Sequence, residues 1–249
     1  CGLAGDLMRW WKGLAAAAIG LAVLGGCSKN SSSSDAQLRL LNASIGYPSL
    51  DLQVNAVTQT GSASTVAYGA AGSYVSVSTD AITTSVATSG SSAALSSASR
   101  TLSSDTRYTQ VAYGAQGALK IAQIQENIAT PASGLTSLAV LNLAPDAGSV
   151  DVYLGTTSSI ASASLVATNV QSGAGSSYNS VSAGTYYFWI TGNGDTTDIR
   201  LSGQGLVLGS GQVMNLILSG STGGLLVNAI GMVQQTAENA TQNLANTMA

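Results

Sequence analysis

The sequence contains no histidine, and only 8% of its 249 residues are charged. Histidine is the commonest general base in enzymes and a very common metal ligand, so its absence disfavours most hydrolytic and metal-dependent chemistry. The eight Lys and Arg residues are spread along the chain. No basic stripe can therefore neutralise phosphates, and we expect no nucleic-acid partner. Because 45% of the residues are hydrophobic, the low charge does not indicate disorder.

Cysteine is almost absent too, and its position is informative. Residues 8–12 form a short basic stretch, and the apolar stretch Gly13–Leu24 that follows is too short to span a bilayer, which needs about 20 residues. These are the proportions of a signal peptide. The segment ends in Leu24-Gly25-Gly26-Cys27, which resembles the bacterial lipobox. We therefore predict that residues 1–27 are a signal peptide and that Cys27 becomes an acylated N-terminus carrying palmitate.

Acylation of Cys27 would anchor the chain, because each buried CH₂ group contributes about 0.8 kcal/mol to membrane binding. The Ser-rich residues 28–36 are predicted to be a flexible tether. The residue that follows the cysteine is Ser28 and not an aspartate. By resemblance to Gram-negative lipoproteins, this favours sorting to the outer membrane. With Cys27 acylated and Cys1 outside the mature chain, no thiol remains for a disulfide, redox chemistry or zinc.

The rest of the sequence repeats itself. Four residues recur 100 positions later, and further matches follow at offsets of 104 and 106, as loop insertions between shared strands would produce. The identical residues are Leu38, Leu41, Asn42 and Asp51, which recur as Leu138, Leu141, Asn142 and Asp151.

Within each copy, hydrophobic residues alternate with polar ones, as in Leu50-Asp51-Leu52-Gln53-Val54. This period of two predicts strands with one buried face. Short strands at about ten-residue spacing predict an all-β protein with two tandem antiparallel β-sandwich domains, immunoglobulin-like, after an N-terminal signal helix. We assign residues 37–130 to the first sandwich, 131–136 to a linker and 137–233 to the second. Residues 234–249 are predicted to be a polar tail, either a short helix or loose.

One segment carries a family resemblance. Residues 140–153, which contain Ala144-Pro145-Asp146-Ala147-Gly148 and end in Val150-Asp151-Val152-Tyr153, resemble the opening signature of the bacterial domain of unknown function 4397. Residues 181–186 resemble its second landmark, whereas Asn142 and Leu143 stand near the place where that family often has a histidine. The resemblance implies a secreted or lipid-anchored β-rich protein in tandem copies and supplies no reaction.

Candidate catalytic groups are few. A serine nucleophile needs a base, and the sole candidate in the folded part is Lys120, which alternation places as an outward charge on an edge strand. Asp51 and Asp151 are repeat-equivalent carboxylates, yet both lie in mid-strand, and we expect each to cap loop amides or face solvent. Asp195 and Asp198 lie in a short loop where calcium is conceivable, although a hairpin turn explains them more simply. We predict no cofactor and no metal.

The two copies differ most clearly in aromatic residues. Tyr187 and Trp189 lie on one face of a strand on which the first copy has Thr83 and Ser85. Aromatic pairs on flat β surfaces are common anchors for sugars and proteins. The pair therefore either packs against the other domain or the core, or forms an exposed binding platform.

Together these features favour a lipid-anchored, non-enzymatic protein of the cell envelope that is structural or adhesive, with a polysaccharide or another envelope protein as partner. The first alternative is a carboxylate-based glycan-acting enzyme, which would need two carboxylates about 5 to 10 Å apart in a cleft. The second is a self-assembling surface or matrix protein, because exposed strand edges favour edge-to-edge association.

Overall fold

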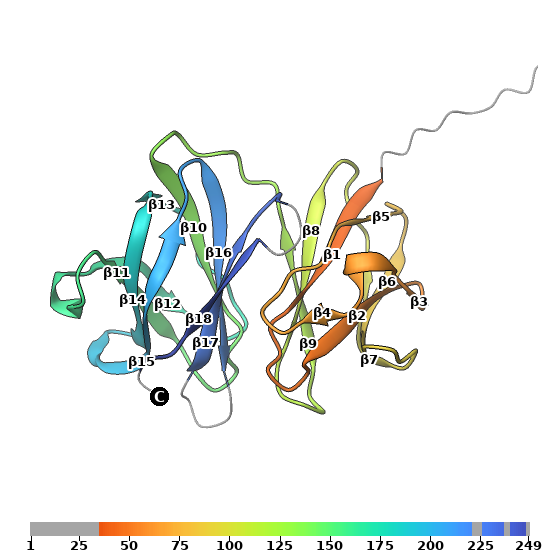
Figure 1. Cartoon of the computed structure of the whole chain (residues 1–249), viewed down its shortest axis with the longest axis horizontal. Helices are drawn as coiled ribbons and strands as arrows, with labels where there is room; N and C mark the ends of the chain where they lie inside the picture. Colours follow the sequence, from red (N-terminus) through yellow and green to blue (C-terminus); the bar gives the residue numbers. More distant parts are fainter. Residues whose placement is uncertain (1–34, 221–225, 237–239, 248–249) are drawn as a thin grey trace, which may run out of the picture. The chain divides into compact units, whose positions relative to one another are not determined.

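The computed structural model describes residues 35–220, 226–236 and 240–247, which belong to one compact unit (Figure 1). The predicted signal peptide, its helix and Cys27 lie outside the described residues. Within the described ranges, no helix has the length and apolar character needed to cross a membrane.

Two β-sandwiches make up the fold, which confirms the predicted fold class. The first has an inner sheet of order β5-β1-β8-β9 and an outer sheet of order β3-β2-β6-β7, in which β4 also pairs with β2. Its elements are β1 (Ala36–Asn42), β2 (Ser49–Val54), β3 (Val57–Thr58), η1 (Gly61–Ala63), β4 (Val66–Ala67), β5 (Val75–Val77), β6 (Ile82–Thr88), β7 (Ala94–Arg100), β8 (Arg107–Tyr113) and β9 (Lys120–Gln125).

The second sandwich repeats this plan, except that β18 is added to its inner sheet and β12 alone stands in its outer sheet where the first sandwich has β3 and β4. Its inner sheet has the order β13-β10-β16-β17-β18, and its outer sheet has the order β12-β11-β14-β15. Its elements are β10 (Leu135–Asn142), β11 (Val150–Gly155), η2 (Ile160–Ser162), β12 (Ser164–Val170), β13 (Asn179–Ser182), β14 (Gly184–Gly192), β15 (Asp195–Leu208), β16 (Gln212–Gly220), β17 (Leu226–Val233) and β18 (Thr241–Ala245).

The alternating pattern produces a core in each sandwich. Leu50 and Leu52 of β2 are fully buried in the first core, and Val150 and Val152 of β11 are fully buried at the equivalent places of the second. Residues of the two sandwiches are called equivalent here when the strand pairing places them alike: Leu52 pairs with Val86 as Val152 pairs with Ile190.

Not every pairing is antiparallel, which corrects the predicted sheet. In each inner sheet one pair runs parallel, namely β1 with β8 and β10 with β16. These strands are far apart in sequence and are not joined by a hairpin, and no tight turn imposes the antiparallel direction.

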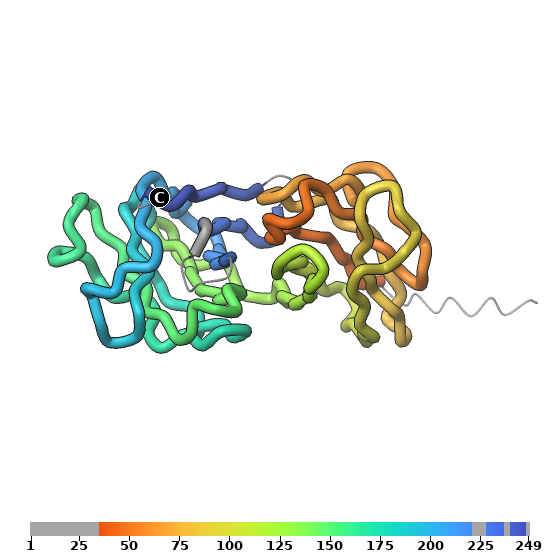
Figure 2. The backbone as a smooth tube through the Cα atoms, turned by 90° about the horizontal axis from the view of Figure 1, so that it is seen from below, coloured from red at the N-terminus to blue at the C-terminus, as the bar shows by residue number. Residues whose placement is uncertain are grey.

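The predicted boundaries also need correction. β10 begins at Leu135, inside the segment assigned to the linker, and β1 begins at Ala36. The predicted polar tail is neither a helix nor loose in its described part: β18 pairs antiparallel with β17, and Leu244 is buried in the second core (Figure 2, dark blue). A single leucine among polar residues gave little periodicity from which to predict this strand.

Each inner sheet also buries hydrophobic residues on its second face, and these residues of the two sheets meet in a third hydrophobic cluster, called the seam here. The first sandwich contributes Leu41, Val111 and Ile124, and the second contributes Ile217, Ile230 and Met232. Val111 and Ile217 are equivalent, as are Ile124 and Met232. The same surface of each sandwich is therefore used in the seam.

Candidate functional site

The aromatic pair lies on the outer face of β14 in the outer sheet of the second sandwich. The rings of Tyr187 and Trp189 are stacked, with centroids 6.3 Å apart and planes at 21°. Their strand neighbours Phe188 and Ile190 point into the core. Neither Tyr187 nor Trp189 belongs to the seam cluster, so of the alternatives raised by the sequence, packing against the other domain is not supported by that cluster.

A small hollow adjoins this pair, and we call it the aromatic pocket. It has a volume of about 250 Å³ and is lined by Ser158, Tyr187, Trp189, Ser202, Gly203, Gln204 and Thr247. Its lining carries no charged side chain. Trp189 is only 7% exposed, because Gly155 of the neighbouring strand lies directly against it: a Cβ at that position would be 3.2 Å from Cζ3 of the indole. Tyr187 is the more exposed ring.

The equivalent aspartates have structural work instead of catalytic work. The carboxylate of Asp151 accepts hydrogen bonds from the backbone N–H groups of Asn169 (2.7 Å) and Gly194 (2.9 Å), and from the side chains of Thr168 and Asn193. Burial acts to raise the pKa of Asp151, but these hydrogen bonds to the charged form outweigh it and hold the pKa below its ordinary value.

Asp51 does the same in the first sandwich. It accepts hydrogen bonds from the backbone N–H groups of Thr65 (2.6 Å) and Gly90 (2.9 Å), and from the hydroxyl of Ser89. We expected each aspartate to cap loop amides or to face solvent, and the structure shows the first alternative, with Asp51 bonded to the N–H groups of Thr65 and Gly90 and Asp151 bonded to that of Gly194. A buried carboxylate recurs in both copies because each one bonds its strand to two neighbouring segments: Asp51 holds two loops, and Asp151 holds the turn at Gly194 and the end of β12 at Asn169.

Asp195 and Asp198, which were predicted to lie in a short loop, belong instead to the start of β15, and they have separate partners. The side chain and backbone of Thr197 donate hydrogen bonds to Asp195 and lower its pKa. Asp198 instead forms an ion pair with Arg200 at 2.7 Å. Within the described parts of the chain, no three Asp, Glu, Cys or His side chains are grouped as metal ligands would be. Lys120 is exposed at the start of the edge strand β9, as its sequence context predicted.

Sequence analysis missed a larger groove, which we call the edge groove. It has a volume of about 740 Å³ and lies between β12 and β13, the edge strands of opposite sheets in the second sandwich. Leu165, Val166 and Val181 line it together with serine hydroxyls, and Leu165 is half exposed. In the first sandwich the η1 turn, with buried Ala63, lies close to β5 through the bond from Ser73 N–H to Ser62 O. No sequence pattern distinguishes these two loop paths.

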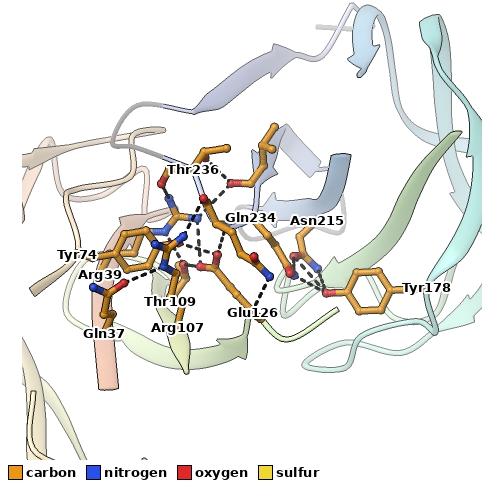
Figure 3. Close-up of polar contacts among 12 residues, drawn as sticks. Gln37, Arg39, Tyr74, Arg107, Thr109, Glu126, Tyr178, Asn215, Gln234 and Thr236 are labelled. Carbon is orange, nitrogen blue, oxygen red and sulfur yellow. Dashed lines mark hydrogen bonds and ion pairs between the residues drawn. The ribbon is translucent and has the colours of Figure 1, made fainter. Parts of the chain in front are cut away.

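Beside the seam lies a buried ion pair that sequence analysis also missed (Figure 3). Arg39 of β1 is fully buried and donates to Glu126 (3.1 Å) and to the hydroxyl of Thr109 (2.7 Å). Tyr74 donates to the second oxygen of Glu126 at 2.6 Å, and the Arg39 guanidinium lies 4.5 Å from the centre of its ring. Burial is the main cause that raises the pKa of Tyr74 above its ordinary value. These four residues are called the Arg39 cluster.

The second sandwich closes over the Arg39 cluster. The backbone carbonyls of Val233 and Thr236 accept hydrogen bonds from Arg39, and the N–H of Gln235 donates to Glu126. The Arg107 guanidinium lies 5.2 Å from the centre of the Tyr74 ring and donates to the carbonyl of Gln235 at 3.0 Å. The ion pair of Arg39 and Glu126 therefore lies within the first sandwich and also bonds it to the second.

Equivalent positions in the second sandwich form a neutral version, called the Tyr178 cluster (Figure 3). Tyr178, Asn215 and Gln234 stand where the first sandwich has Tyr74, Thr109 and Glu126, and Ala139 stands in place of Arg39. Gln234 donates to the hydroxyl of Tyr178 (2.6 Å) and to Asn215 (2.7 Å). Burial raises the pKa of Tyr178. Both clusters thus contain a tyrosine with a polar neighbour, whereas the charged pair is present only in the Arg39 cluster.

Comparison with known proteins finds one partial family match and no activity. Residues 36–153 match a family described as Domain of unknown function (DUF4397). The match spans the first sandwich, β10 and the first part of β11, which is fewer than half of the 249 residues. No curated protein matches the chain.

Proposed function

We propose that this chain is a lipid-anchored, non-enzymatic binding module of the cell envelope, built from tandem copies of the DUF4397 domain and held at the outer membrane through acylated Cys27. Its ligand is a neutral polysaccharide bound at the aromatic pocket. The observation that carries the binding site is the stacked Tyr187–Trp189 pair beside a hollow without charged lining. Aromatic rings contact the apolar faces of sugars at low entropic cost, and hydroxyl and amide groups at the rim can hydrogen-bond sugar hydroxyls.

The carboxylates already accept hydrogen bonds from within the protein, and this favours a binding role over the glycan-acting enzyme. Glycoside hydrolysis needs one carboxylic acid and one carboxylate free to face the substrate. Asp51 and Asp151 each accept several hydrogen bonds from neighbouring backbone N–H groups, and the pKa of Asp151 is lowered, which is the wrong direction for a general acid.

Binding can be followed through Trp189 itself, because it is the only tryptophan after residue 11. A chain beginning at residue 28 would be titrated with dextran, chitin oligomers and the acidic polysaccharide alginate. We expect a neutral polymer to change the Trp189 fluorescence, and Tyr187→Ser to weaken that binding at least tenfold without lowering the melting temperature by more than a few degrees. Leu165→Ser removes an exposed apolar residue away from the aromatic pocket and serves as the matched control.

Failure of every neutral polymer, or equal binding by wild type and Tyr187→Ser, would reject the polysaccharide site. The variant with both Tyr187 and Trp189 changed to serine lacks the fluorescent probe, so its binding is measured by isothermal titration calorimetry; loss of stability alone, with binding unchanged, would assign the pair to packing. The anchor is tested separately by labelled palmitate, which should enter the wild-type chain and not Cys27→Ala. Size-exclusion chromatography of the chain from residue 28 addresses the self-assembly alternative, which predicts oligomers that grow with concentration.

A further inference from the structure

The two sandwiches differ at one sheet edge. In the second, β17 is covered by β18, which pairs with it antiparallel from Met232 to Asn228. In the first, β9 is equivalent to β17 and is the last strand of its sheet, and among the described residues no strand pairs with its outer side. In the second sandwich, β18 thus shows how an extended segment pairs with this edge. The equivalent edge of the first sandwich, β9, is open among the described residues.

The backbone of β9 is oriented to accept such a segment. The N–H of Glu126 bonds to the carbonyl of Arg107 in β8, so the N–H groups of Gln125, Gln123 and Ile121 point away from β8 by the alternation of a strand. The equivalent arrangement in the second sandwich is occupied, since the N–H of Val233 bonds outward to the carbonyl of Ala240.

The side chains behind the two edges differ in chemistry. In the second sandwich, Leu206, Leu216 and Gly231 stand behind β18, and a Cβ on Gly231 would lie 3.7 Å from Leu206 and 3.6 Å from Gln242. The equivalent residues of the first sandwich are Arg100, Gln110 and Gln123. The side chains behind this edge are therefore apolar in the second sandwich, whereas in the first sandwich they carry hydrogen-bond donors.

Two of these donors are unsatisfied. Gln110 is only 1% exposed, and its Nε2 has no hydrogen-bond partner among the described residues. The buried Nε of Arg100 has none either, and no ion pair of Arg100 is found in the described ranges. Buried donors without partners are costly and uncommon in folded proteins. A residue placed opposite Gln123, where Gln242 lies in the second sandwich, would stand next to both.

We propose that the outer edge of β9 binds an extended segment of a partner protein, which adds as an antiparallel strand and places a carboxylate opposite Gln123. Backbone hydrogen bonds supply the affinity of such strand addition, and inward side chains supply its specificity. A carboxylate accepts from both donors and pairs with the cation of Arg100. A β18 segment exchanged from a second copy is disfavoured, because it presents Gln242 and Leu244 and no carboxylate.

The test uses fluorescent peptides that copy residues 240–247. The probe carries glutamate in place of Gln242, and its two controls carry the native glutamine or leucine there. The full chain in detergent should bind the glutamate peptide at least tenfold more tightly than the leucine peptide, as measured by fluorescence anisotropy. Arg100→Met should remove most of the preference for glutamate over glutamine, while circular dichroism verifies that the variant is folded.

Methylation of single peptide amides separates strand addition from simple charge attraction. A methyl group on the N–H of the glutamate faces β9 and should weaken binding at least tenfold. A methyl group on the next N–H, at the position of Asn243, faces away and should change binding less than threefold. The proposal is overturned if the glutamate peptide does not bind, if both methylated peptides bind alike, or if Arg100→Met leaves the preference intact. None of these outcomes depends on the aromatic pocket.

Discussion

The buried ion pair at the seam makes a quantitative prediction about stability. The side chains of Arg39 and Glu126 are both fully buried. Removing one member of such a pair leaves the other charge without its partner and costs about 3–5 kcal/mol, whereas replacing both members with neutral groups of similar volume is often close to neutral. The second sandwich already shows a neutral arrangement, with Ala139 and Gln234 at the equivalent positions.

Three variants test this in a double-mutant cycle. Glu126→Gln copies the residue of the second sandwich and leaves the Arg39 charge to Thr109 and two carbonyl groups, so we expect it to destabilise the chain by about 3 kcal/mol. Arg39→Met keeps most of the side-chain volume but removes the cation that balances the buried carboxylate of Glu126, and we expect a similar cost. The double variant should lose less than about 2 kcal/mol, which corresponds to a coupling of about 4 kcal/mol between the two residues.

Urea unfolding of the chain beginning at residue 28, followed by Trp189 fluorescence and by circular dichroism, measures these free energies. Because both substitutions lie in the first sandwich and Trp189 lies in the second, a shift in the Trp189 transition also reports that the seam couples their unfolding. Simple addition of the two single costs in the double variant would refute the argument, since it would mean that neither charge depends on the other. An unmoved Trp189 transition would show that the second sandwich unfolds independently.

The capping aspartates supply the remaining predictions. Asp151→Asn keeps the shape but exchanges a charged acceptor for an amide facing two backbone N–H groups, and should cost about 2–3 kcal/mol, as should Asp51→Asn, both measured by urea unfolding. The pKa of Asp151 is lower in the folded chain than its ordinary value of 3.8, so its stabilisation is fully present above that value and is lost as the pH falls through the lowered folded pKa. Unfolding free energies measured between pH 5 and about pH 2 should therefore fall more steeply for wild type than for Asp151→Asn, and parallel curves would contradict this.

Much of this fold could be predicted from period-two alternation. Leu50 and Leu52 point inward as the pattern required, and Asp51 between them caps loops as its mid-strand place suggested. The seam was harder to predict, although a signal existed. β16 contains Leu216-Ile217-Leu218, a continuous apolar run that is typical of a strand buried on both faces. Which surface covers the second face depends on packing between distant segments, and alternation within one strand does not contain it.

The candidate site was predicted in part, and the reason lies in comparison of the copies. Tyr187 and Trp189 were found because the first copy has Thr83 and Ser85 at those positions. The same comparison could have found Glu126 opposite Gln234, but the offset between the copies there is 108, beyond the last motif that the sequence aligns. The depth to which Gly155 lets Trp189 sink into the sheet was beyond prediction, because it depends on a neighbouring strand.

Equivalent surfaces meet at the seam, as they do in the isologous contact of a two-fold symmetric dimer. The two halves nevertheless differ where symmetry would demand identity: the Arg39 cluster is charged and the Tyr178 cluster is neutral. A seam between two first sandwiches would bury two ion pairs, at twice the desolvation cost, and would lack the Gln235 N–H and the Val233 and Thr236 carbonyls that satisfy the pair here. The charge asymmetry therefore favours pairing of the two sandwiches within one chain over pairing of first sandwiches from two chains. Pairing within one chain keeps the open β9 edge in the first sandwich and the aromatic pocket in the second sandwich of the same molecule.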